Sequence, residues 1–314
     1  MAGDSQGRWA QGVRLLNRLT QARAQQSGWM DALGRMSSRV RAEGLVDDDA
    51  LSRLDMLDEA LSTYGYDPFG FSPEFVKKLI PAVAWLYRVY FRVQTTGVDT
   101  IPDGPVLLIS NHSGQLPLDA MMIVGACLLD KTQPRMVRSM VERWVPTLPF
   151  ASWILARSGQ IVGTRDNFRR LVQQGAPILV FPEGVVGINK TYDKAYQLQR
   201  FGYGFMRLAL ENGMPIVPVA VVGAEEQAPS LANIEPLAKL LGAPAFPITP
   251  TFPWLGPLGL LPYPVRYHIH FGEAMRFEGQ PDDEDRVIGE KVDRVKAAIQ
   301  AMLDRGVAER VSIF

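Results

Sequence analysis

The sequence predicts an α/β protein with a mixed, mostly parallel sheet flanked by helices and with a helical extension at its N-terminus. From residue 97 onward, short apolar runs alternate with stretches of helical spacing, which is typical of strands joined by helices. Before that point, apolar residues within 9–63 recur every three or four positions, as on the buried face of a helix. Hydrophobic residues form 47% of the 314 residues, enough for a substantial core, which excludes disorder throughout.

The N-terminal extension is expected to be helical. Four leucines share helical spacing: Leu51, Leu54, Leu57 and Leu61. They follow an acidic triplet at 47–49, which suits the start of a helix. The segment 64–70 contains two glycines and a proline, and it interrupts the pattern. We therefore divide the chain into an extension, residues 1–70, and a main domain, residues 71–314.

The main domain is expected to begin with a broadly apolar helix at 73–92, which suits either a protein core, the commoner case, or a bilayer surface. Six apolar runs are then predicted strands: 106–110, 135–140, 160–163, 177–181, 216–222 and 266–271. Helical spacing predicts helices at 120–129, 167–174, 205–212 and, closing the chain, 284–306. We find no internal repeat.

Charge and cysteine content exclude several classes of function. Lysine plus arginine equal aspartate plus glutamate at 33 each, so no overall charge favours binding to nucleic acid. Cys127 is the single cysteine, which excludes an internal disulfide and a multi-cysteine metal site, and we interpret it as a buried packing residue. The first residues lack the basic and apolar regions of a secretory signal, so we expect a cytoplasmic location.

The uncharged segment 240–265 is long enough to be mistaken for a membrane span. Its seven prolines exclude a continuous helix, because each removes a backbone donor. We expect an apolar loop, and two interpretations stay open. It packs onto the domain as a cover, or it places Phe252, Trp254 and Leu255 at a membrane interface.

The three histidines have different settings. His112 directly follows the predicted strand 106–110, at the sheet edge where α/β proteins bind ligands, and imidazole suits removal of a proton from an alcohol. Asp119 either folds back to orient this ring, which we favour, or merely complements a helix dipole. His268 and His270 share a strand face, but a third metal ligand is not evident, so we favour a structural role and predict no metal site.

Further polar residues follow other predicted strands. Glu183 and Gly184 belong to Phe181-Pro182-Glu183-Gly184, which leaves a strand and turns at glycine, so they are expected at the same sheet edge as His112. Arg165 also follows a strand end, and its guanidinium could meet a phosphate or form a surface salt bridge. Lys190, Lys194 and Arg200 add positive charge nearby, or form a solvated face.

Taken in order, these residues resemble the glycerophospholipid acyltransferase family, the lysophosphatidic acid acyltransferase-like enzymes, over about residues 95–275. Four blocks carry the resemblance: Asn111-His112 with Asp119, Gly159 with Arg165, Phe181-Pro182-Glu183-Gly184, and Pro215-Ile216-Val217-Pro218-Val219. Two features depart from the family pattern. Six residues instead of four separate the histidine from the aspartate, and the basic residue usual before a later glycine is present only as a shifted Arg200.

The resemblance implies an O-acyltransferase of phospholipid biosynthesis that uses an acyl thioester of coenzyme A or acyl carrier protein as co-substrate and no cofactor. His112 would act as general base and Asp119 would orient it. Arg165, Glu183, Gly184 and Arg200 would bind a lysophospholipid or related glycerolipid. The enzyme would be peripheral, on the cytoplasmic face of the membrane. Two alternatives stay open: a neutral or non-glycerol alcohol as acceptor, and a non-catalytic lipid-binding or scaffold protein.

Overall fold

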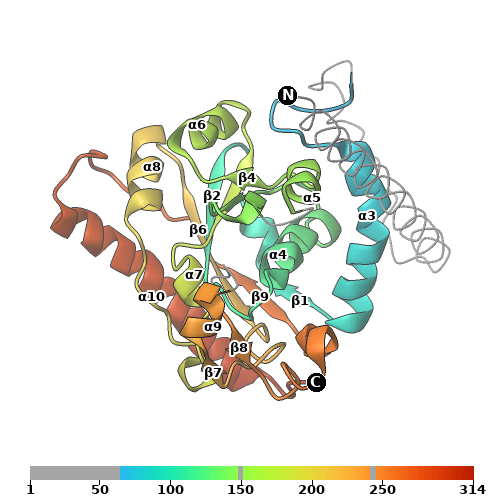
Figure 1. Cartoon of the computed structure of the whole chain (residues 1–314). Coiled ribbons are helices and arrows are strands. Elements are labelled where there is room, and N and C mark those ends of the chain that lie inside the picture. The colour runs from blue at the N-terminus through green and yellow to red at the C-terminus, as the bar shows by residue number, and fades with distance from the viewer. Residues whose placement is uncertain (1–63, 148–150, 241–244) are drawn as a thin grey trace, which may run out of the picture.

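The computed structural model describes residues 64–147, 151–240 and 245–314. The helices predicted within 9–63, and with them most of the proposed extension, lie outside the described residues. A seven-stranded sheet forms the centre of the molecule, in the order β1-β9-β6-β2-β5-β3-β4 (Figure 1). Its strands are β1 (Gln94–Thr96), β2 (Val106–Ser110), β3 (Arg138–Val141), β4 (Ile161–Val162), β5 (Pro177–Val180), β6 (Ile216–Val222) and β9 (His268–Phe271).

All neighbouring strands of this sheet are parallel except β6 and β9, which pair antiparallel. The predicted mixed, mostly parallel sheet is therefore confirmed. A separate antiparallel pair joins β7 (Ala232–Asn233) to β8 (Pro247–Ile248). The α-helices of the described residues are α3 (Pro73–Trp85), α4 (Leu118–Leu129), α5 (Ala151–Arg157), α6 (Arg165–Gln173), α7 (Val185–Ile188), α8 (Gly204–Asn212), α9 (Glu235–Leu240) and α10 (Asp285–Glu309).

Helices cover both faces of the sheet, so every residue of β2 is buried (Figure 1). Val106 and Leu108 of β2 belong to a core shared with α3 and α4. Leu107 and Ile109 point to the opposite face and join a second core with α6, α8 and α10. Successive side chains of β2 therefore enter opposite cores, which explains why Val106 to Ile109 are all apolar. Such a run is expected for a parallel strand buried on both faces.

The first helix of the main domain is shorter than predicted. Ser72 caps α3 by accepting a hydrogen bond from the N–H of Phe75 at 3.3 Å, and Pro73 occupies the first helical position. The α-helix ends at Trp85 and continues as one π-helical stretch, η2 (Leu86–Tyr90). The apolar breadth of this helix serves the core, because most of α3 is buried.

The sequence does not predict the short elements β1, β7, β8, α5, α7 and α9, and two of them show why. β1 is a polar three-residue edge strand whose existence depends on backbone pairing with β9, so no apolar period marks it. α5 follows the short 3₁₀ turn η4 (Val145–Thr147), in a stretch between two strands for which the sequence predicts neither helix nor strand. The remaining 3₁₀ turns of the described residues are η3 (Val98–Thr100), η5 (Tyr192–Lys194) and η6 (Gly256–Leu260).

The segment 240–265 is mostly irregular where the structure describes it, with β8 and η6 as its regular elements. Phe252 is half-buried against Phe246, with ring centroids 5.1 Å apart, whereas Trp254 is 75% exposed. The segment thus combines a packed part and an exposed apolar part. Among the described residues, no helix is long and apolar enough to cross a membrane. Cys127 is fully buried in α4, as the packing interpretation predicts.

Candidate active site

His112 lies in the loop that joins the end of β2 to α4, at the carboxyl edge of the parallel strands. Its ring Nδ1 lies 2.7 Å from Oδ2 of Asp119, so the expected fold-back of the loop is confirmed. Gly114 allows this path, because its φ of 77° belongs to the left-handed region that favours glycine. The two additional residues between histidine and aspartate are therefore accommodated in the loop.

Asp119 is fully buried in the first turn of α4, and its carboxylate accepts hydrogen bonds from backbone N–H groups as well as from the imidazole. The backbone N–H of Ser113 donates to Oδ2 at 3.0 Å, and that of Ala120 donates to Oδ1 at 2.7 Å. Three donors suit the acceptor-only form of a carboxylate. With the carboxylate as acceptor, Nδ1 carries the ring proton, and Nε2 is left as the nitrogen that can accept a second one.

Two amide side chains hold the histidine loop, and sequence reasoning had given neither a role of its own. Asn111 bridges to β6: its Nδ2 donates to the carbonyl of Val221 at 3.1 Å, and its Oδ1 accepts the Val221 N–H at 2.8 Å. Gln227 is fully buried, and its Nε2 donates to the carbonyls of Gly114 at 2.9 Å and Leu116 at 3.2 Å. No local pattern marks Gln227, because the two loop carbonyls that it binds are more than 100 positions away.

Glu183 is buried, and both of its carboxylate oxygens are occupied by backbone donors. Oε1 accepts the N–H of His112 at 3.0 Å, and Oε2 accepts the N–H of Gln199 at 2.7 Å. Glu183 is not among the residues that line the neighbouring cavity. This carboxylate thus joins the His112 loop to the loop of Gln199. A contact between Glu183 and substrate stays a prediction.

The ring of His112 stacks on Phe181, with centroids 4.0 Å apart and ring planes 20° apart. Phe181 directly follows β5, the parallel neighbour of β2, so the sheet itself brings the first and third motif blocks together. Gly187 in α7 completes the packing, because a Cβ at this position would lie 2.9 Å from the His112 carbonyl oxygen. Three contacts thus hold His112: Phe181 packs on one face of the ring, Asp119 binds Nδ1, and Glu183 accepts the backbone N–H.

A cavity of about 1130 Å³ opens beside His112. Arg165, at the first position of α6, and Gly184 line it together with His112 and Phe181. One side of its wall is apolar and comes from α3 and α4: Val76, Leu79, Ile80, Val83, Met121, Val124 and Leu128. The structure therefore brings His112, Asp119, Arg165 and Gly184 into one site, with room for an apolar chain beside the base.

The other predicted cations lie elsewhere. Arg200 is exposed and is not among the cavity-lining residues, so it does not join the site in this structure. Lys190 is buried, and its Nζ lies 2.7 Å from Oε1 of Glu225, so its charge is used inside the protein. Burial raises the pKa of Glu225 above its ordinary value, while Lys190 acts in the opposite direction. The expected positive charge around the third block is thus smaller than the sequence indicates.

His268 and His270 lie half-buried on β9. Within the described ranges, no group of three His, Cys, Asp or Glu side chains could hold a metal ion. Nδ1 of His270 lies 2.7 Å from the Thr96 hydroxyl of β1, which joins the two strands. Burial lowers the pKa of both imidazoles, and neighbouring positive charges add to this effect.

A family model described as acyltransferase matches residues 92–222, which contain the residues of all four motif blocks. Uncharacterized proteins of Mycobacterium tuberculosis and Mycobacterium leprae are each 37% identical to the chain over 257 residues, which is 80% of this chain and 72% and 70% of theirs. A Gallus gallus protein described as "DGAT1/2-independent enzyme synthesizing storage lipids" is 23% identical over 221 residues, 69% of this chain and 61% of its own.

Among solved structures, the 1-acyl-sn-glycerophosphate acyltransferase of Thermotoga maritima matches 90% of this chain and 97% of its own, with a TM-score of 0.48 and 14% sequence identity. The family model agrees with the resemblance that the motif blocks carry. The chain belongs to the glycerophospholipid acyltransferase family.

Proposed function

We propose that the protein transfers a fatty acyl group from an acyl thioester, carried by coenzyme A or acyl carrier protein, to a hydroxyl of a lysophospholipid or related glycerolipid. The observation that supports this most is the 2.7 Å contact between His112 Nδ1 and buried Asp119 beside a cavity with an apolar wall. The vertebrate relatives are described as enzymes that synthesise storage lipids, which agrees with a lipid acceptor.

In the proposed reaction, Nε2 of His112 takes the proton of the acceptor hydroxyl as the oxygen attacks the thioester carbonyl. Asp119 keeps the ring oriented and stabilises the imidazolium that forms, as a buried carboxylate does in hydrolytic triads. The tetrahedral intermediate then collapses: the C–S bond breaks, and the leaving thiolate takes the proton back from Nε2. The products are an ester and a free thiol, and no acyl-enzyme forms.

The cavity wall supports this division of roles. The apolar side chains of α3 and α4 suit a fatty acyl chain, because burying each methylene contributes about 0.8 kcal/mol. Arg165 has no ion pair or hydrogen bond to another described residue, so its guanidinium is available to a polar ligand group. Gly184 has a φ of 57° and leaves the turn beside Glu183 without a side chain.

The decisive experiment measures thiol release and lipid product mass with palmitoyl coenzyme A and a panel of lysolipid and acylglycerol acceptors. The wild-type protein and His112→Ala are compared, with His268→Ala as a control that removes an imidazole outside the site. We expect product from the wild type and the control, and a loss of at least about a thousandfold in His112→Ala. Undiminished transfer by His112→Ala would refute the mechanism. Liposome binding without turnover of any donor, including acyl carrier protein thioesters, would favour the scaffold alternative.

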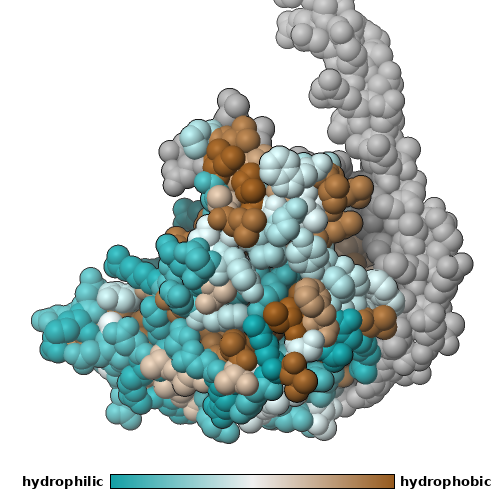
Figure 2. All heavy atoms as spheres, turned by 90° about the horizontal axis from the view of Figure 1, so that it is seen from below, coloured by the Kyte–Doolittle hydropathy of each residue, from teal (hydrophilic) through white to brown (hydrophobic). Residues whose placement is uncertain are grey.

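We also propose that the enzyme is peripheral on a membrane, whose cytoplasmic face the sequence suggests. Support comes from the exposed apolar side chains of the segment around η6, where Trp254 is 75% and Leu258 is 69% exposed. Figure 2 shows hydrophobic residues gathered in clusters on the face seen from below, where this segment lies in Figure 1. An amphipathic indole beside aliphatic side chains suits the boundary between water and lipid.

This second proposal is tested by liposome sedimentation. The double variant Trp254→Ser, Leu258→Ser should bind vesicles of neutral and anionic phospholipid more weakly than the wild type. Tyr64→Ser removes an equally exposed aromatic ring elsewhere and serves as the control. Equal sedimentation of the wild type and the double variant would refute this role of the segment.

A further inference from the structure

The charges on the cavity wall balance, which is unusual for a site that would receive a phosphomonoester. Six charged side chains line the cavity: Arg165, Arg169, Arg207, Glu142, Glu211 and Asp282. Three positive groups thus face three negative ones. A phosphomonoester carries about −1.5 to −2 charges near pH 7, and proteins receive it with unpaired guanidinium or ammonium groups.

Two of the three arginines are already paired. Arg169 donates to the carboxylate of Glu211 through Nε at 3.0 Å and Nη2 at 2.6 Å. Arg207 pairs with Asp285 at 2.7 Å and also donates to the Asp283 carbonyl at 3.1 Å. Arg165 is therefore the one arginine of the cavity wall without an ion pair among the described residues.

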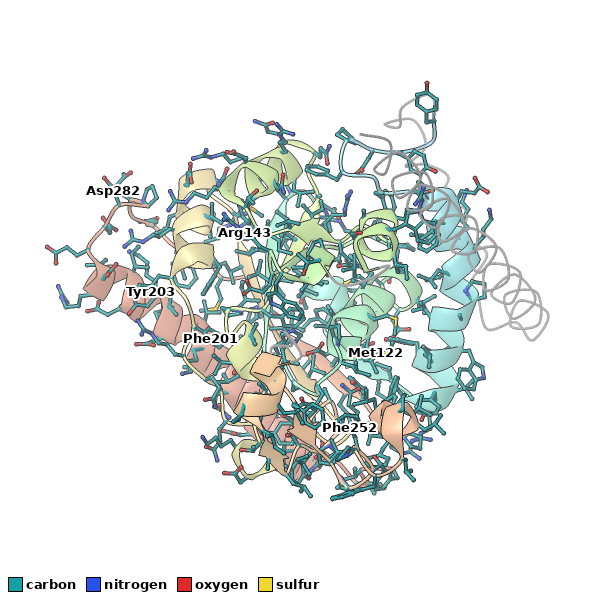
Figure 3. The ribbon with its side chains drawn as sticks, in the orientation of Figure 1. Met122, Arg143, Phe201, Tyr203, Phe252 and Asp282 are labelled. Atoms are coloured by element: carbon teal, nitrogen blue, oxygen red, sulfur yellow. The ribbon has the colours of Figure 1, made fainter. Side chains whose placement is uncertain are left out.

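Glu142 directly follows β3 and places a negative charge beside the turn that contains Glu183 and Gly184. Its Oε1 lies so close to Gly184 that a Cβ on this glycine would be 3.2 Å from it. The carboxylate lines the same cavity as His112, and no hydrogen bond or ion pair to a described residue occupies it. Its neighbour Arg143 is exposed and is not among the lining residues. Figure 3 shows Arg143 well apart from Phe252.

The residues that follow Gly184 add no positive charge. Val185 lines the cavity and Val186 is exposed, so the turn continues with aliphatic side chains. Lys190, the first cation after this turn, is buried in its pair with Glu225. A free carboxylate and aliphatic side chains therefore lie at the turn next to the base, and Arg165 is the only unpaired arginine among the described residues of the cavity wall.

Building on the proposed function, we propose that Glu142 determines acceptor specificity and that the preferred acceptor has a free hydroxyl in place of a phosphate, as in a monoacylglycerol. An ionised carboxylate only accepts hydrogen bonds, so it suits the second hydroxyl of a neutral glycerol head group. The same carboxylate repels a phosphomonoester, and like charges placed together discriminate strongly against a wrong partner. Arg165 then binds oxygen atoms of the donor or of the glycerol backbone.

The test compares monoacylglycerol with lysophosphatidic acid of the same acyl chain, each with palmitoyl coenzyme A, by the ratio of their kcat/KM values. We expect the wild type to prefer monoacylglycerol by at least about tenfold. Glu142→Gln should bring the ratio toward one, and Glu142→Arg should reverse it. Glu290→Gln removes a carboxylate from an exposed pair on α10 and should leave the ratio unchanged.

The possible failures are distinguishable. If the wild type transfers acyl groups to lysophosphatidic acid as well as to monoacylglycerol, and Glu142→Gln leaves the ratio unchanged, this inference is wrong while the proposed function stands. If the wild type consumes no thioester with any acceptor, the proposed function fails and the inference fails with it. Glu142 is exposed, so its substitution does not disturb the core, and circular dichroism of each variant verifies this.

Discussion

Replacing Gln227 with leucine tests whether a buried amide far from the motifs positions the catalytic histidine. The Gln227 side chain joins three partners: Nε2 donates to the Gly114 and Leu116 carbonyls, and Oε1 accepts the Tyr267 hydroxyl at 2.6 Å. Leucine has a similar volume and no polar atoms, so the substitution removes these hydrogen bonds with little change in packing.

The expected loss of stability follows from which partners are left without a hydrogen bond. The Tyr267 hydroxyl is fully buried, and losing its acceptor costs about 1–3 kcal/mol. The two carbonyls each keep a backbone donor, from the N–H groups of Leu116 and Leu118, so their loss is about 0.5–1 kcal/mol each. The sum is roughly 2–5 kcal/mol, and about 3 kcal/mol corresponds to a decrease of roughly 6–12 °C in Tm.

Activity should fall more than stability alone explains, because the loop that follows His112 loses its tether. A displacement of about 1 Å of a catalytic group costs on the order of a hundredfold in rate. Tyr267→Phe is the matched control: it also breaks the Tyr267 hydrogen bond, but it keeps both bonds from Gln227 to the loop. We expect kcat/KM to fall at least about tenfold in Gln227→Leu and less than about threefold in Tyr267→Phe.

Urea unfolding followed by tryptophan fluorescence gives the stability of each variant, and thiol release from palmitoyl coenzyme A gives kcat/KM well below the unfolding transition. If Gln227→Leu is destabilised as calculated but its kcat/KM equals that of Tyr267→Phe, the tether does not position His112. The hydrogen bonds of Gln227 would then serve the core alone.

Three further predictions concern single residues. Asp119→Asn should reduce kcat by at least about a thousandfold, because an amide replaces a carboxylate that accepts three N–H donors, and a loss below about tenfold in the thiol-release assay would contradict this. Burial raises the pKa of Cys127 to about 12, so this thiol should react with a disulfide reagent only in urea, and rapid labelling of the native protein would disagree. Burial lowers the pKa of His270, so its contribution to stability is complete above the unfolded-chain pKa of about 6.5 and is lost as the pH falls toward the folded-state value. Between pH 7.5 and 5.5, the free energy of unfolding should therefore decrease less in His270→Gln than in the wild type, and an equal decrease would rule out this contribution.

Several features of the site were predictable from local pattern. β2 is apolar from Val106 to Ile109, β6 is apolar throughout, and both strands are fully buried. Both begin and end at the predicted residues. Because ligands bind at the carboxyl edge of parallel strands, the position of His112 directly after β2 indicated the site before any contact was known. The fold-back of Asp119 was also expected, since the loop contains Gly114 and a proline before α4.

Other features depend on partners far away in the chain. The polar strand β1 exists because β9 offers it backbone hydrogen bonds, so its own composition does not indicate a strand. Glu183 and His112 meet across 71 positions, and Gln227 and Gly114 across 113. Their residue types indicate only that they can form hydrogen bonds, and the fold decides with which groups they form them.

Apolar periodicity was enough to predict the α/β class and the strands that carry the motif blocks, and the short distance between His112 and Asp119 in the chain favoured their pairing. Which charges remain free at the cavity depends on the folded chain. The fold buried Lys190 against Glu225, turned Glu183 toward two backbone N–H groups and placed Glu142 beside Gly184. A charged side chain is available to a ligand only if no partner inside the protein pairs with it, and folding brings that partner into contact.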